Sequence, residues 1–85
     1  MSGGKWKLKL LYVMKMFLEE TDEENTLTVP QIIKKLEEYG IAADRRTVYD
    51  DIETLKDFGM DIILERTKTF NYFLGNRDFQ LPELK

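Results

Sequence analysis

Histidine and cysteine are both absent from this sequence of 85 residues, and proline occurs only twice. The absence of cysteine excludes disulfides, thiolate nucleophiles and thiolate metal ligands. The absence of histidine removes the commonest general base and the commonest metal ligand. Because no glycine-rich phosphate loop is present either, the sequence predicts a binding module rather than an enzyme, with no metal and no cofactor.

Long hydrophobic runs are also absent. The longest apolar stretch, Leu10–Met14, is far shorter than the ~18 residues that a membrane span needs. Lys5, Lys7 and Lys9 interrupt any early apolar stretch that could act as a signal peptide. An apolar content of 42% with 34% charged residues is ordinary for a globular protein, and the length suits one domain. We therefore expect a soluble, cytoplasmic domain with no membrane partner.

Net charge, taken over the whole chain, argues against a nucleic-acid partner because it is −3. The charges are unevenly spread, however. Residues 5–18 hold four lysines and no acid, whereas residues 19–26 hold five acids and no base. Since much of the acid lies in one polar connector, contact with a polyanion elsewhere on the surface is not excluded.

Apolar spacing and end signals predict three helices. The first covers about residues 5–20, and its predicted buried stripe is Leu10, Leu11, Met14, Phe17 and Leu18, with Trp6, Tyr12 and Val13 outside it. The second begins at Val29, after the capping-box spacing of Thr28 and Gln31, and stops at Gly40. The third covers residues 45–58, between the N-cap Asp44 and Gly59. The predicted apolar faces are Ile32, Ile33 and Leu36 in the second helix and Val48, Ile52, Leu55 and Phe58 in the third.

Residues 62–66 and 70–74 are β-branched and aromatic runs separated by three polar residues, which predicts a two-stranded hairpin. The second and third helices are joined by a connection of the length found in helix-turn-helix motifs. The predicted fold is therefore mainly α with a small β-hairpin, a three-helix winged helix-turn-helix. Residues 1–4 are expected to form a flexible tail, residues 5–75 the domain, and residues 76–85 the start of a linker toward an absent C-terminal domain.

In a helix-turn-helix, the N-terminal part of the second helix of the motif enters the major groove of DNA. Arginine can bind guanine through two hydrogen bonds, whereas aspartate finds a donor only at cytosine N4. Backbone N–H groups at a helix start can bind phosphate. The predicted contacts with double-stranded DNA are Arg45, Arg46, Thr47, Tyr49 and Asp50 in the third helix, Thr28 and Gln31 at the start of the second, and Lys68 at the hairpin tip.

Two questions stay open at this level. Asp50 either selects a cytosine or lowers the affinity for all sequences, because phosphates repel it. The alternative to DNA binding is a winged helix that binds another protein, with Trp6, Tyr12 and Phe79 at the interface.

The run Asp44–Gly59 resembles the recognition-helix segment of the winged helix-turn-helix domains that begin WYL-domain bacterial transcription regulators. The resemblance extends to Leu10–Tyr12, Leu27–Ile32 and Tyr72–Gly75, and the tail Phe79–Lys85 is similar to the lead into the family's interdomain helix. It implies a sequence-specific DNA-binding domain of a transcription regulator. Small molecules would then bind outside this fragment, and dimerisation would occur through the missing C-terminal domain. The family usually has a basic residue where Asp50 stands.

Overall fold

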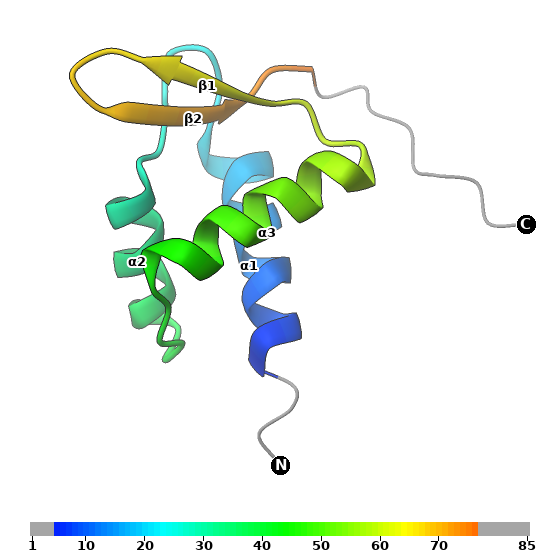
Figure 1. Ribbon diagram of the computed structural model, residues 1–85, viewed down its shortest axis with the longest axis vertical. Coiled ribbons are helices and arrows are strands. Elements are labelled where there is room, and N and C mark those ends of the chain that lie inside the picture. The colour runs from blue at the N-terminus through cyan, green and yellow to red at the C-terminus, as the bar shows by residue number, and fades with distance from the viewer. Residues whose placement is uncertain (1–4, 77–85) are drawn as a thin grey trace, which may run out of the picture.

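The computed structural model describes residues 5–76, which form three helices and one antiparallel hairpin (Figure 1). The elements are α1 (Lys5–Glu20), α2 (Val29–Glu38), α3 (Arg45–Phe58), β1 (Ile62–Arg66) and β2 (Phe70–Leu74). The hairpin lies across one end of the helices, and α3 packs against both α1 and α2 (Figure 1). The predicted helices, strands and winged fold are confirmed. The tail predicted at residues 1–4 and the linker predicted at 76–85, apart from Asn76, lie outside the described residues.

The ends of α2 are set by the local signals that its sequence carries. The Thr28 N–H donates to Gln31 Oε1 (2.8 Å), and the Gln31 N–H donates to Thr28 Oγ1 (3.3 Å), which completes the capping box. At the other end, the Ile41 N–H donates to the Leu36 carbonyl (3.0 Å). Gly40, at φ 78°, makes this reversal without the steric cost of a Cβ.

Helix α3 begins and ends in the same way. The Asp44 carboxylate accepts from the Thr47 N–H, and Gly59 adopts φ 122° after the last turn. Val48, Ile52 and Leu55 are buried as predicted. The prediction for Phe58 was wrong, since 40% of its surface is exposed. The turn at Gly59 brings Met60 into the core instead, where it is buried and donates its N–H to the Leu55 carbonyl.

The buried face of α1 differs from the predicted stripe. Val13 is completely buried, whereas 54% of Leu11 is exposed, so the inward face is rotated toward Val13 and Phe17. The reason is that α1 contacts α2, α3 and β2, and these contacts select the inward face. This face includes one charged residue, Lys9, which is 7% exposed. The Lys9 ammonium forms an ion pair with the Asp51 carboxylate of α3. This partner explains how a lysine can occupy an inward position.

The outer edge of β2 is covered by the segment that connects α1 to α2. Leu27 forms an isolated bridge with Tyr72, with N–O distances of 2.9 and 2.8 Å. Two residues further along β2, the Leu74 N–H donates to Thr21 Oγ1 (3.0 Å), and that hydroxyl donates to the Phe17 carbonyl (2.7 Å). Thr21, which was placed in the polar connector, is therefore buried. These bonds occupy edge groups that could otherwise pair with another chain.

The core lies where the inner faces of the three helices meet the hairpin. Its completely buried side chains include Phe17 of α1, Ile32 and Leu36 of α2, Ile52 of α3 and Leu74 of β2. The helices within residues 5–76 lack the combination of length and apolarity that crossing a bilayer requires.

Candidate nucleic-acid interface

The N-terminal half of α3 exposes most of the side chains that were predicted to face DNA. Arg45, Arg46 and Asp50 are exposed, and Tyr49 is half-buried. Val48, between them, is completely buried in the core. The helix is therefore turned about its axis as the apolar spacing predicted.

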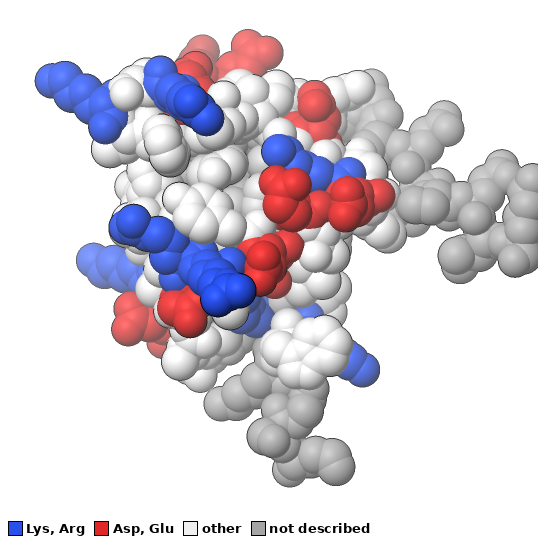
Figure 2. Space-filling model, in the orientation of Figure 1, with Lys and Arg blue, Asp and Glu red and all other residues white. Residues whose placement is uncertain are grey.

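Charged side chains of the two signs are unevenly spread over this face of the molecule (Figure 2). Positive side chains gather over the beginning of α3 and over the hairpin tip, with uncharged surface between them, while acidic side chains lie over the C-terminal half of α3 (Figure 2). The acidic half includes the exposed Glu53 and Asp57. A polyanion is thus attracted most strongly at the beginning of α3 and at the hairpin tip.

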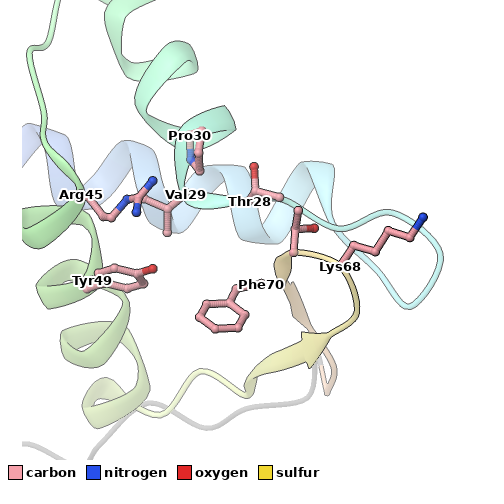
Figure 3. A pocket seen from close by; sticks show the side chains of 8 residues that line it. Thr28, Val29, Pro30, Arg45, Tyr49, Lys68 and Phe70 are labelled. Atoms are coloured by element: carbon pink, nitrogen blue, oxygen red, sulfur yellow. The ribbon is translucent and has the colours of Figure 1, made fainter.

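A groove of about 290 Å³ joins the two positive regions. Its walls come from the start of α2, the start of α3 and the hairpin tip. It is lined by Thr28, Val29, Pro30, Arg45, Tyr49, Lys68, Thr69 and Phe70. Figure 3 shows Arg45 and Tyr49 projecting from α3 on one side, the Phe70 ring opposite, and Lys68 turned outward at the rim.

This groove brings together four of the predicted residues, namely Thr28, Arg45, Tyr49 and Lys68. It does not include Gln31 or Thr47. Gln31 holds its side chain against the Thr28 N–H, and Thr47 lines a separate hollow beside the α2–α3 connection. The Thr47 hydroxyl also donates to the Asp44 carbonyl (3.1 Å), so binding DNA through this hydroxyl would compete with a helix cap.

Three of the N–H groups at the start of α2 already donate hydrogen bonds within the helix start. Those of Thr28 and Gln31 donate within the capping box, the Ile32 N–H donates to the Thr28 carbonyl, and Pro30 has no N–H. Binding of an anion at this end of the groove therefore depends chiefly on side chains. Arg45 and Lys68 are the cations that line it.

Arg46 and Asp50 lie one turn apart on the outer face of α3, a spacing at which opposite charges can attract each other. Both are exposed, and neither takes part in the ion pairs found within residues 5–76. Their charged groups are thus available to a ligand that approaches this face.

Tyr49 is held from behind by a second aromatic residue. Its ring meets that of Tyr72 edge-on, with 6.5 Å between the centroids. Burial raises the pKa of the Tyr72 hydroxyl, so this supporting ring stays neutral at physiological pH. The contact orients Tyr49 toward the groove.

Sequence reasoning missed two features of this region. The first is Phe70, which lines the groove with half of its surface exposed, whereas Tyr72, Phe73 and Leu74 of the same strand are buried. The second feature is the Lys9–Asp51 pair, which connects α1 to α3 behind the predicted DNA-facing surface. These two partners are 42 positions apart in the sequence, so no local pattern could predict the pair.

The Asp44 carboxylate, at the N-terminus of α3, has a pKa below its usual value. The main cause is the Thr47 N–H, which donates to Asp44 Oδ1 at 2.9 Å, and the Thr47 hydroxyl adds to the effect. Nearby positive charges on Lys9 and Arg46 lower the pKa further. Because the unfolded chain binds the proton more readily, this group contributes stability above its unfolded pKa of about 3.9 and loses that contribution as the pH falls through the folded pKa.

We predict that Asp44→Asn makes the domain less sensitive to acid. Asparagine caps a helix about as well as aspartate but does not titrate. Urea unfolding at several values between pH 7 and pH 3 should show the wild type losing more stability than the variant over the acidic part of the range. Parallel stability curves would show that the carboxylate makes no pH-dependent contribution at this helix start.

The three helices, the short α2–α3 turn and the paired hairpin define a winged helix-turn-helix domain. The sequence model of the family described as "FokI, D3 domain" matches residues 12–67, and the chain belongs to this family. The family's domain is a winged-helix-like DNA-binding domain. Searches of curated proteins and of solved structures found no match. The relation to WYL-domain regulators stays a prediction.

Proposed function

We propose that this chain binds double-stranded DNA in a sequence-specific manner, as the DNA-binding part of a transcription regulator. The N-terminal half of α3 would enter the major groove, and the hairpin would lie on the adjacent backbone. The observation that carries the proposal is the groove that joins Arg45 of α3 to Lys68 of the hairpin. The FokI D3 family supports DNA binding, and the regulator role rests on the resemblance in sequence.

The distribution of charge supports this orientation. A duplex laid against the beginning of α3 meets Arg45 and Arg46, while Glu53 and Asp57 keep the C-terminal half of the helix away from the phosphates. The overall charge of −3 then limits non-specific binding without preventing a local contact. Asp50 would face the bases, where it either selects cytosine or weakens binding to every sequence.

The test is fluorescence anisotropy with duplex DNA at two salt concentrations, since the release of counterions makes DNA binding depend steeply on salt. Arg46→Ala is expected to weaken binding to a selected site by about 1–3 kcal/mol. Its binding to random DNA should change less. Arg45→Ala should weaken binding to both DNAs and reduce the salt slope by about one phosphate contact.

Lys34→Ala is the matched control, because Lys34 is an exposed cation of α2 outside the groove. It should bind like the wild type. Equal losses from the Lys34 and Arg46 substitutions would show that only the net charge matters. Salt-independent binding, or none, would contradict the proposal.

A protein-binding winged helix is the second candidate, and the exposed apolar residues of α1 favour it. Trp6 is 63% exposed, and Leu8 and Leu11 are also exposed. If the domain binds another protein, substitutions of these three residues should weaken that binding. Substitutions of Arg45 or Arg46 should leave it unchanged.

A further inference from the structure

The groove between α3 and the hairpin has a lining that phosphate binding alone does not explain. Besides its two cations, it is lined by two aromatic rings, Tyr49 and Phe70, and by Val29 and Pro30. Half of the Phe70 surface is exposed, although it lies at the start of a strand whose later residues are buried. An exposed aromatic ring beside cations is a combination used to bind unstacked nucleobases.

Both rings are supported by neighbours outside the groove. The Tyr49 ring meets the buried Tyr72 ring at 6.5 Å, and the Arg66 guanidinium lies 5.3 Å from the centre of the Phe70 ring. Arg66 is also the cross-strand partner of Phe70 in the hairpin. These contacts restrict the rings before a ligand arrives, which lowers the entropy lost on binding.

From this arrangement we propose that the groove takes one unpaired base of a DNA strand, with Phe70 and Tyr49 contacting the base. Arg45 and Lys68 would bind the phosphates of the same strand. The groove's 290 Å³ lies just below the ~300–1,000 Å³ of typical small-molecule pockets, so one ring system fits better than two stacked nucleotides. The inference rests on the DNA binding proposed above and adds a base-binding site beside α3.

Two threonine hydroxyls in the groove lining, those of Thr28 and Thr69, still have hydrogen-bonding capacity for such a base. The Thr28 hydroxyl accepts a bond from the Gln31 N–H, and its own hydrogen can still be donated. Thr69 donates its hydroxyl hydrogen to Asn71 Oδ1 (2.9 Å), which leaves its oxygen able to accept. One donor and one acceptor therefore border the aromatic surface.

The experiment compares three labelled DNAs by fluorescence anisotropy with the 85-residue protein. They are a blunt duplex, the same duplex with one extra unpaired thymine at its centre, and the corresponding single strand. Wild-type protein should bind the bulged duplex roughly tenfold more tightly than the blunt duplex, as expected for one base stacked on aromatic side chains. Phe70→Ala should remove this preference, so that the variant binds the bulged and blunt duplexes with similar affinity.

Two further substitutions separate stacking from other effects. Phe70→Tyr keeps a ring and should keep the preference for the bulge, whereas Phe70→Leu keeps only apolar surface and should lose most of it. Phe58→Ala is the matched control, because Phe58 is an exposed phenylalanine of α3 outside the groove. Thermal melts by circular dichroism verify that each variant is folded.

Equal affinity for blunt and bulged duplexes would overturn the base-binding site and leave the proposed duplex binding intact. A preference for the bulge that survives Phe70→Ala would overturn the assignment to this groove. Binding to the single strand alone, lost in Phe70→Ala, would support the base-binding site and contradict the proposed duplex binding.

Discussion

Replacing Lys9 with methionine is expected to destabilise the domain by about 2–4 kcal/mol, since it leaves the Asp51 carboxylate without its partner in a largely desolvated position. Methionine keeps most of the apolar stem of lysine and favours a helix as well as lysine does, so the loss reports mainly on the charge. Lys9 is buried in α1, and only 16% of the Asp51 side chain in α3 is exposed. Urea unfolding followed by circular dichroism measures the difference.

Two controls distinguish this pair from an ordinary surface contact. Lys56→Met breaks the exposed pair with Glu53 at 3.4 Å and should cost less than about 0.5 kcal/mol. The double variant Lys9→Met with Asp51→Leu removes both buried charges and should recover a large part of the loss. A loss of similar size for Lys9 and Lys56, or no recovery in the double variant, would show that the Lys9 charge is not compensated by Asp51.

The same pair has a consequence for DNA binding. Asp51 lies next to Asp50 in sequence, but it faces α1 while Asp50 faces solvent. The ion pair therefore helps to hold α3 at the rotation that presents Arg46 and Asp50 outward. Loss of the Lys9–Asp51 pair would therefore be expected to affect both the stability of the domain and the orientation of the DNA-facing side of α3.

Thr21→Val is expected to destabilise the domain by about 1–3 kcal/mol, the cost of leaving a buried N–H without an acceptor. Valine has nearly the shape of threonine, but it cannot accept the hydrogen bond of the Leu74 N–H (3.0 Å) or donate to the Phe17 carbonyl. Both residues of the edge contact are buried. Hydrogen exchange by NMR should show the Leu74 amide exchanging faster in the variant than in the wild type.

Thr21→Ser is the control for this substitution, because serine keeps the hydroxyl and loses only a methyl group. It should cost about 1 kcal/mol or less and keep the Leu74 amide protected. If the valine variant is as stable as the wild type, the Thr21 hydroxyl does not hold β2 against α1. The hairpin would then depend on its apolar face and on the Leu27 bridge alone.

Element boundaries could be predicted from the sequence because their causes are short-range. The capping box of Thr28 and Gln31 and the positive φ of Gly40 and Gly59 act within a few residues, so their positions mark where α2 and α3 begin or end. The outward direction of Arg46 was predictable for a similar reason. Because each residue of a helix turns by about 100°, the direction of the Arg46 side chain follows from that of the buried Val48 two positions later.

The sequence alone determined the three helices, the hairpin, the winged arrangement and the exposed half of α3, since propensity, caps and apolar period are all properties of neighbouring residues. Tertiary structure alone decided which face of α1 turns inward. Apolar residues occur around much of that helix, and only the positions of α2, α3 and β2 select among them. It also decided that Lys9 meets Asp51 and that Phe70 joins Arg45 and Tyr49 in one groove. These contacts join residues far apart in the chain, so their existence depends on how the elements pack.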